Sequence, residues 1–563
     1  MDKKTFTTDE LNNIPHGVLV MLYQQLQDSF QVMISQNETI QKQNEQLLKQ
    51  VDSLQESIAV MQQNRFGRSS EKNLQIPGQC VLFPDTNPML NEAELVLDQE
   101  GMAEEPTYET VVKKHGKRPK GKREADLEDL ETIVEPTYTI PEEELKTLFP
   151  KGYHRLPDEV YKDLEYVPAH LVVHEHHIAV YAGNHDVGGI VRAPHPKRLL
   201  QNSILTPELA SGVFNAKYVN AIPIHRLKEE FDRCGANIST QVMCGWMIKL
   251  VDRYLEPFYE ALHKEQLKSK LIHCDETPFC VVEKKENSQA KDPHKQYMWV
   301  YHIAEQYGGH PIYVYCYTEG RGYEIPKKYL DGYKGILMTD GYQVYHTLEK
   351  ERPDELKVAG CWAHARRKFA DLVKSGSGIP AAKRRVAEEA VQRINAIYHL
   401  DNTQKEATAK ERLNYRQTVI KAQVEAYFAW VDEILNTQGL DKGSKLYHAL
   451  NYSHNQKQFL KAFLDDPIIP LDNNDAERSI KKFCVGKHNW HIAATKSGAH
   501  ASAVLYSIAE TAKANGLKPR EYFLFLLKGL LEQPELKDPA EYLSDLMPWS
   551  EKVPAEARKT IKK

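Results

Sequence analysis

Three short segments of this chain each carry a carboxylate where a metal ligand could stand. Residues 271–275 and 335–340 are typical of short buried strands, and each ends in an acid, Asp275 or Asp340. Residues 472–478 are typical of a helix start that carries Glu477 in its first turn. Acids in these positions suit Mg²⁺, which prefers oxygen ligands and keeps several of its waters.

The chemistry that such acids support is phosphodiester cleavage, which two Mg²⁺ ions about 4 Å apart assist. We expect Asp275 to bridge two Mg²⁺ ions, for which Mn²⁺ can substitute, and Asp340 and Glu477 to complete one coordination sphere each. Strand alternation sends Glu276 to the face opposite Asp275, so it is the weaker ligand candidate. Asp475 shares the first helical turn with Glu477, and both acids could simply complement the helix dipole.

The segments around the acids predict the sheet that positions them. Residues 297–302 and 312–317 are rich in aromatic and β-branched residues and flank a turn at 307–310, which predicts a hairpin. A further strand is expected at 356–361. These elements follow the order of a ribonuclease H-like sheet: a strand, a hairpin, a strand that ends in an acid and another strand.

The N-terminal part of the chain carries a heptad pattern. An apolar residue recurs every seven positions from Leu19 to Met61, which predicts a coiled-coil seam. The second row of core positions includes Asn37 and Asn44, and buried asparagines there fix the register at some cost in stability. We expect residues 19–61 to form a homodimeric coiled coil, with a long helix packed on its own protein as the alternative.

The overall charge is not that of a simple nucleic-acid binder, because 73 Lys and Arg face 78 Asp and Glu for a net charge of −5. DNA contacts must therefore come from local patches, of which residues 113–123 are the densest. Their basic side chains could neutralise phosphates as a minor-groove arm does, or form a solvated linker. The residues concerned are Lys113, Lys114, Lys117, Arg118, Lys120, Lys122 and Arg123. An acidic run precedes them, so residues 73–135 are expected to be a mostly disordered connector.

Residues 136–200 are typical of short strands and turns, with β-branched alternation between 170 and 181. Six histidines lie between positions 170 and 195, but no cysteine and no paired ligand spacing accompanies them. We therefore expect solvated or strand-face histidines and no zinc.

Residues 201–265 are typical of helices, with Gly235 in a turn and Ser239 as the expected N-cap of the helix that follows. A helix, a glycine turn and a second helix form the layout of a helix-turn-helix that reads DNA. The same layout is equally ordinary in a generic helical hairpin.

No apolar run approaches the length of a membrane span, and no signal peptide is visible at the N-terminus. The eight cysteines form no CxxC pair, which suits reduced thiols. We expect a cytoplasmic, nucleoid-associated protein without disulfides or membrane contact.

Six short sequence blocks stand out in chain order: RFGRSSEK at 65–72, HCDET at 273–277, TDGYQVY at 339–345, CWAHARRKF at 361–369, NNDAER at 473–478 and GKHNW at 486–490. Together they resemble transposases of the insertion sequence 66 family, the large DDE subunits of those bacterial elements. The resemblance covers nearly the whole chain. It maps the family's acids onto Asp275, Asp340 and Glu477, which favours Glu477 over Asp475.

This resemblance implies a DNA transposase that hydrolyses the ends of its element and transfers the exposed 3′-hydroxyl into target DNA through one two-metal site. It also implies a helical insertion between the second and third acids, and residues 381–450 are helix-like. Further DNA contacts are expected near the acids, with core packing an equal alternative for those in the 361–369 block. They are Trp362, His364, Arg367, Arg478, Lys481 and Lys487. The expected partners are terminal repeats, target DNA and accessory proteins of the same element.

One departure from the family concerns zinc. Related chains usually carry a four-cysteine zinc element before the helical region, but residues 101–233 contain no cysteine. We predict that this element keeps its fold without zinc, held by its apolar strands.

The expected fold is multidomain α+β. Its parts are a coiled-coil helix at 1–72, the connector with its basic arm at 73–135, a degenerate zinc-finger-like β element at 136–200, a helical DNA-binding region at 201–265, an RNase H-like core at 266–370 and 466–515, an all-α insertion at 371–465 and a helical tail at 516–563. Two other functions stay open: a catalytically silent DNA-binding or scaffold relative, and an RNase H-like nuclease without strand transfer.

Overall fold

The computed structural model shows a mixed α+β protein that is mostly helical. It describes residues 14–66, 143, 170–182, 190–194, 196–282, 296–307, 309–437, 440–533 and 538–559. The chain divides into two compact units, one of residues 1–85 and 255–514 and the other of residues 86–254 and 515–563. The predicted connector and its basic arm lie outside the described residues.

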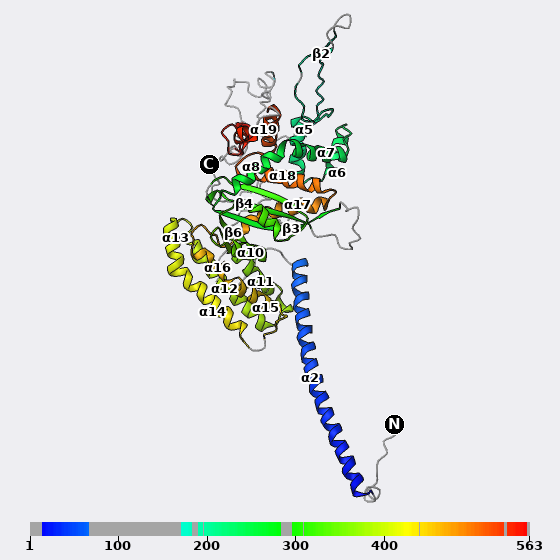
Figure 1. Ribbon diagram of the computed structural model, residues 1–563, viewed down its shortest axis with the longest axis vertical. Coiled ribbons are helices and arrows are strands. Elements are labelled where there is room, and N and C mark those ends of the chain that lie inside the picture. Colours follow the sequence, from blue (N-terminus) through cyan, green and yellow to red (C-terminus); the bar gives the residue numbers. More distant parts are fainter. Residues whose placement is uncertain are drawn as a thin grey trace. The chain divides into compact units, whose positions relative to one another are not determined.

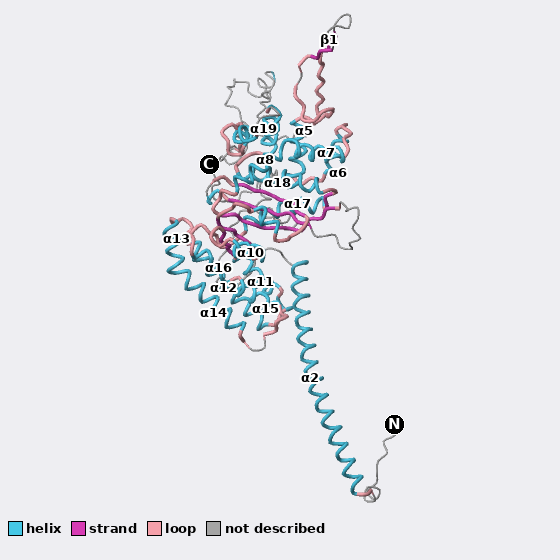
Figure 2. The backbone as a smooth tube through the Cα atoms, in the orientation of Figure 1, coloured by secondary structure: helices cyan, strands magenta, loops and turns pink. Residues whose placement is uncertain are grey.

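The first unit contains a mixed sheet, drawn as arrows in Figure 1 and in magenta in Figure 2. Its strand order is β5-β4-β3-β6-β7, in which β3, β4 and β5 are antiparallel while β6 and β7 run parallel to β3. The bounds are β3 Leu271–Val281, β4 Gln296–Ile303, β5 Ile312–Thr318, β6 Gly335–Thr339 and β7 Leu356–Gly360, with β8, Ile492–Ala493, beside the end of β3. The predicted hairpin and the strands predicted at 335–340 and 356–361 are confirmed. The prediction that the first strand ends at Asp275 is wrong, because pairing with β4 and β8 extends β3 to Val281.

Helices pack on this sheet. The helix α17 (Asn474–Trp490) contacts β3 and β4, and α18 (Lys496–Ala514) contacts the edge strand β5. The backbone N–H of Tyr315 donates to Ser507 Oγ at 2.8 Å, so a hydroxyl of α18 satisfies a donor that an edge strand would leave free. The remaining helices against the sheet are α8 Glu256–Gln266, α9 Glu324–Tyr329, α10 Gln343–Glu351 and α16 Lys457–Lys461.

The predicted helical insertion is present between β7 and α17. Its helices are α11 Trp362–Lys374, α12 Ala381–Asn402, α13 Ala409–Tyr415, α14 Lys421–Leu435 and α15 Lys445–Asn455. A π-helical turn joins α13 to α14 and places Arg416 in the interior, where its side chain is fully buried. Arg416 Nε donates to Asp401 Oδ1 at 2.7 Å, and Nη1 donates to the carbonyls of Phe463 and Asp466. The insertion therefore has a buried, hydrogen-bonded ion pair in its core.

The heptad region forms one helix, α2, from His16 to Phe66, which confirms the predicted helix. Its seam is largely exposed, with Leu26 68 % and Met33 58 % accessible. Near its C-terminal end Glu56 is buried, forms an ion pair with Lys383 of α12 and accepts the backbone N–H of Lys445 at 3.2 Å. The helix is thus anchored to the insertion by its last turns, and pairing with a second copy stays a prediction.

The second unit is mainly helical. Its elements are α5 Pro207–Phe214, α6 Ile224–Arg233, α7 Thr240–Leu250, α19 Pro519–Glu532 and α20 Pro539–Leu546, with a short hairpin of β1 Val180–Ala182 and β2 Ile190–Arg192. Gly235 follows α6 with a φ of 83°, a value that glycine tolerates, and Ser239 Oγ accepts the N–H of Val242 as the expected N-cap of α7. The predicted helix-turn-helix layout is present, and its role in reading DNA stays a prediction.

The four described histidines of the β-rich region, His170, His174, His176 and His177, are exposed. Across the part of the chain that the structure describes, no helix is both long and apolar enough to cross a membrane.

Candidate metal centre

The parallel pairing of β3 with β6 sets the first two acids at the same level on neighbouring strands. The register pairs Leu271 with Ile336 and His273 with Met338. Asp275 stands two residues after His273, inside β3, and Asp340 stands two residues after Met338, directly after β6. Because the two strands are parallel neighbours, the same offset along each chain brings the two acids next to each other.

Asp275 is held in a strongly negative environment. One of its carboxylate oxygens accepts the N–H of Glu276 at 2.8 Å. Burial raises the pKa of Asp275 well above its usual value, and the charges of Glu276, Asp340 and Glu477 raise it further. The third predicted ligand is therefore close enough to act electrostatically on the first.

The turn after β6 fixes Asp340. Its side chain accepts the N–H of Tyr342 at 3.1 Å, and its carbonyl accepts the hydroxyl of Tyr452 at 2.6 Å. Gly341 has a φ of +94°, and an added Cβ would lie 3.0 Å from atoms of Tyr452 and Gln456. Glycine is needed here for the backbone conformation and for the close approach of α15.

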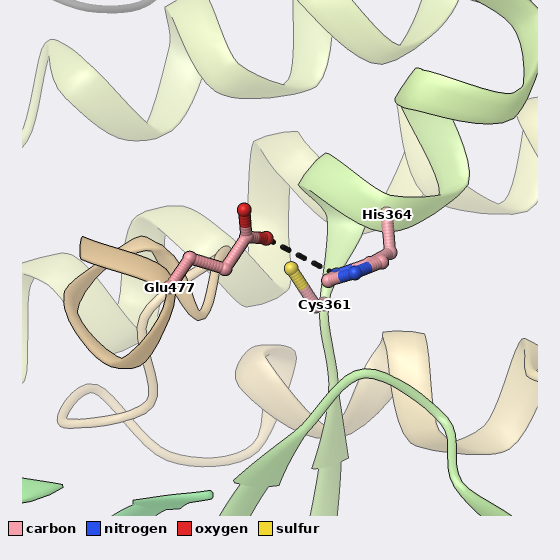
Figure 3. Close-up of side chains that lie close together, drawn as sticks. All are labelled: Cys361, His364 and Glu477. Atoms are coloured by element: carbon pink, nitrogen blue, oxygen red, sulfur yellow. Dashed lines mark ion pairs between the residues drawn. The ribbon is translucent and has the colours of Figure 1, made fainter. Parts of the chain in front are cut away.

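Glu477 enters the site from the first turn of α17. The side chain is 90 % buried, and Oε2 accepts a 2.7 Å bond from Arg367. Nδ1 of His364 lies 3.4 Å from Oε1. The dashed line in Figure 3 marks this ion pair. Oε1 is buried and has no hydrogen-bond partner among the described residues. This oxygen is the acceptor that remains available to a cation.

Asp475 has a different environment from Glu477. It forms an ion pair with Arg478. Its charge acts on the buried imidazole of His273, where burial lowers the pKa and the neighbouring carboxylate opposes that effect. The surroundings of the two acids therefore agree with Glu477, rather than Asp475, as the candidate third ligand.

Asn473 ties α17 to the sheet. The side chain of Asn473, at the N-cap, makes no capping bond, while Asp472 Oδ1 accepts the N–H of Asn474 at 3.1 Å. Instead Oδ1 of Asn473 accepts from His273 at 2.7 Å, Nδ2 donates to the carbonyl of Cys274 at 2.8 Å, and the backbone N–H donates to Cys361 Sγ at 3.2 Å. One fully buried residue thus connects β3, the end of β7 and the helix that carries Glu477.

Glu276 is closer to the site than strand alternation suggested. Its side chain is 5 % exposed and forms an ion pair with Arg321, whose guanidinium lies 3.8 Å from the ring centroid of Tyr342. Burial, assisted by the charge of Asp340, raises the pKa of Glu276 to about 7. The acid therefore belongs to the electrostatics of the centre without being one of the three predicted ligands.

Two of the predicted DNA contacts in the 361–369 block lie at Glu477, namely His364 and Arg367. Trp362 is fully buried, and its indole N–H donates to the carbonyl of Leu460 at 2.8 Å. For Trp362 the structure favours the alternative of core packing.

The predicted contacts on α17 differ in accessibility. Arg478 and Lys481 are exposed, and Arg478 forms an ion pair with Asp475. Lys487 is half-buried and donates to Thr277 Oγ1 at 3.2 Å and to the carbonyl of Pro278 at 2.9 Å, so it holds the end of β3. The seven basic residues of 113–123 lie outside the described residues.

Sequence reasoning missed Asn473, His273, Glu276 and Arg321 as parts of this site. The first three stand inside the HCDET and NNDAER blocks, directly beside the acids. Their position in those blocks was the available signal. Arg321 is in a loop, and no pattern in the sequence connects it to Glu276.

Comparison with known proteins identifies the family of the chain. The family described as "Transposase IS66 family" matches residues 202–501, and the one described as "Transposase C of IS166 homeodomain" matches residues 53–134. The first match covers more than half of the 563 residues, and it includes all three acids. The class is therefore that of a transposase, and the chain belongs to the IS66 family.

Three relatives come from Sinorhizobium fredii, and each is called an uncharacterized protein. The protein y4qI is 28 % identical over 65 % of this chain and 66 % of its own length. The proteins y4jD and y4hP are 27 % and 24 % identical over 71 % and 70 % of this chain and 76 % and 71 % of their own lengths. The chain thus spans about two thirds to three quarters of these relatives. No solved structure matches the chain.

Proposed function

We propose that this protein is a DNA transposase that cleaves element ends and transfers the 3′-hydroxyl into target DNA through a two-metal centre of Asp275, Asp340 and Glu477. Family membership supports the transposase role. The observation that carries the proposal is the β3–β6 register, which sets Asp275 level with Asp340 on neighbouring strands, and the charge of Glu477 acts on the same buried acid. The strand order β5-β4-β3-β6-β7, with one acid within β3 and one directly after β6, supports an RNase H-like core.

The residues present fit a pair of divalent cations. The pKa of buried Asp275 is raised by burial and by the surrounding carboxylates, and the unpartnered Oε1 of Glu477 offers a buried acceptor. Both observations describe negative charge that a hard cation would compensate. When bound, Mg²⁺ or Mn²⁺ would activate the attacking oxygen and neutralise charge on the phosphate.

The chain's own residues orient the ligands. Arg367 holds Oε2 of Glu477 and leaves Oε1 free, while Asp340 is fixed by the Gly341 turn and the hydroxyl of Tyr452. The exposed side chains of Arg478 and Lys481 follow Glu477 along α17. We assign to these two residues the binding of backbone phosphates, a sequence-independent contact that positions DNA.

Assembly belongs to the same proposal. The exposed seam of α2 supports a homodimer through residues 19–61, because an apolar heptad row in water gains free energy when a second helix covers it. The domain boundaries given above, the zinc-free β element and a role for accessory proteins of the element remain part of the proposal.

A strand-transfer assay on native element ends tests the function. Wild-type protein with Mg²⁺ or Mn²⁺ should join an end to target DNA, and Asp275→Asn should abolish joining while DNA binding survives. Asp475→Asn, in the same helical turn as Glu477, is the matched control and should retain joining. Joining by Asp275→Asn would refute the assignment.

The same assay separates the other functions when branched junctions and RNA–DNA hybrids are added as substrates. Cleavage of these substrates without joining would indicate a nuclease that lacks strand transfer. DNA binding without cleavage of any substrate would indicate a silent scaffold.

A further inference from the structure

A cysteine, a histidine and a glutamate meet beside the proposed centre (Figure 3). Cys361 follows β7, His364 lies in the first turn of α11 and Glu477 comes from α17. One donor atom from each residue lies within 4.8 Å of the other two. Residues three apart face the same side of a helix start, which is why the Cys-x-x-His spacing brings the first two together.

The separation of two of the donors matches a tetrahedral metal site. Zinc binds nitrogen and oxygen ligands at about 2.0–2.1 Å, so two such ligands at the tetrahedral angle stand about 3.4 Å apart. His364 Nδ1 and Glu477 Oε1 are 3.4 Å apart. Both atoms are buried and lack a hydrogen-bond partner among the described residues. Buried polar atoms without a hydrogen bond are costly, and one cation would satisfy both once Nδ1 has lost its proton.

The surrounding hydrogen bonds suit this ligation. The backbone N–H of Asn473 donates to Cys361 Sγ at 3.2 Å, a contact that stabilises a thiolate. Arg367 occupies Oε2 of Glu477 and leaves Oε1 for the metal. Such outer contacts commonly orient metal ligands. The 3.4 Å contact from Arg367 to His364 Nε2 must loosen, which its 39 % exposed side chain permits.

The donor set selects the ion. Thiolate, imidazole and carboxylate together suit zinc, whereas Mg²⁺ takes oxygen ligands. We propose that Cys361, His364 and Glu477 form a Zn²⁺ site, completed by water, and that Zn²⁺ there competes with the Mg²⁺ centre for Glu477. This site is separate from the cysteine-free β element. The competition rests on the proposed function, and the binding of zinc does not.

Cobalt absorption tests the binding. Co²⁺ added to metal-free full-length protein should give a near-ultraviolet thiolate-to-cobalt band and tetrahedral visible bands, which Zn²⁺ should remove. Cys361→Ser should eliminate the thiolate band and weaken zinc binding about 100-fold or more, because loss of an outer contact alone costs 10–100-fold. Cys274→Ser, at another buried cysteine near the acids, should keep the band. A band that survives Cys361→Ser, or no band in wild type, would overturn the proposal.

His364→Gln provides a second variant, because His364 is 23 % exposed and the change is small. It should keep the native circular dichroism spectrum and weaken zinc binding to a similar degree, and unchanged zinc affinity in the folded variant would count against the site. Zinc titrated into a strand-transfer reaction at fixed Mg²⁺ then tests the competition. Inhibition should follow occupancy of the site in wild type, and transfer that persists with the site filled would refute the competition. A cobalt band in a protein that shows no transfer with Mg²⁺ alone, before any Zn²⁺ or Co²⁺ is added, would refute the proposed function and leave the zinc site standing.

Discussion

Replacing Glu276 by Gln should make the protein more stable at neutral and alkaline pH. In the folded state burial and Asp340 raise the pKa of this acid from 4.5 to about 7, even though Arg321 forms an ion pair with it. The folded protein therefore binds this proton more tightly than the unfolded chain does. The stability that Glu276 contributes through this tighter proton binding is fully present below pH 4.5. It is lost as the pH rises toward 7 and stays lost above it.

The magnitude follows from the pKa values. A displacement from 4.5 to about 7, at about 1.4 kcal/mol for each tenfold change, makes ionisation of Glu276 cost about 3 kcal/mol of unfolding free energy at pH 8. Gln has the same shape as the protonated acid and carries no charge at any pH. The variant should gain about 3 kcal/mol over wild type at pH 8 and almost nothing at pH 4.5.

Denaturant unfolding in the presence of a chelator measures both values, because divalent cations would otherwise compensate the carboxylates. The exposed acid Glu305 provides the control, and Glu305→Gln should change stability by less than about 0.5 kcal/mol at either pH. Lower stability of Glu276→Gln at pH 8 would refute the reasoning, since it would mean that the pair with Arg321 outweighs the cost of burial. An equal gain at both pH values would refute it as well, because the effect would then not arise from ionisation.

Two further substitutions test the scaffold of the site. Asn473→Ala should lower the free energy of unfolding by about 3 kcal/mol, because His273 and the carbonyl of Cys274 lose their hydrogen-bond partner, and it should weaken the activation of strand transfer by Mg²⁺. Asn474→Ala is the neighbouring control. An unchanged Mg²⁺ requirement in the folded Asn473 variant would contradict the positioning role. Asp401→Asn should lower the free energy of unfolding, measured with denaturant, by about 3–5 kcal/mol, because Arg416 stays buried without its counter-charge. The control Glu388→Gln breaks an exposed ion pair with Arg384 and should cost less than about 1 kcal/mol. A similarly small loss for Asp401→Asn would show that the buried pair is dispensable.

The sequence predicted the parts of the site that depend on local pattern. Strand alternation and apolar runs located the hairpin, β6, β7 and the first half of β3. Once β3 and β6 are parallel neighbours, the positions of Asp275 and Asp340 follow from the register of the two strands. The choice of Glu477 over Asp475 needed the family resemblance, because both acids occupy one helical turn.

The remaining features depend on contacts between distant residues. Asn473 stands where a capping residue is expected, yet its side chain bonds to His273, 200 positions away. Nothing local distinguishes these two uses of an asparagine. Arg416 would be assigned to a helix surface, and its burial follows from a π-helical turn and from partners in three other segments. Strand alternation could not reveal that Glu276 feels the charge of Asp340, which comes from a neighbouring strand.

The contact between the end of α2 and the helical insertion links two equilibria: the pairing of α2 with a second copy and the folding of the insertion. Glu56 is buried against Lys383 only while the end of α2 is helical and the insertion is folded. A partner that binds the folded α2 and not its unfolded form stabilises everything that folds with it. If the seam of α2 pairs with a second copy, the unfolding temperature of the insertion should therefore rise with protein concentration. In a protein with this linkage the insertion would be most stable in the dimer.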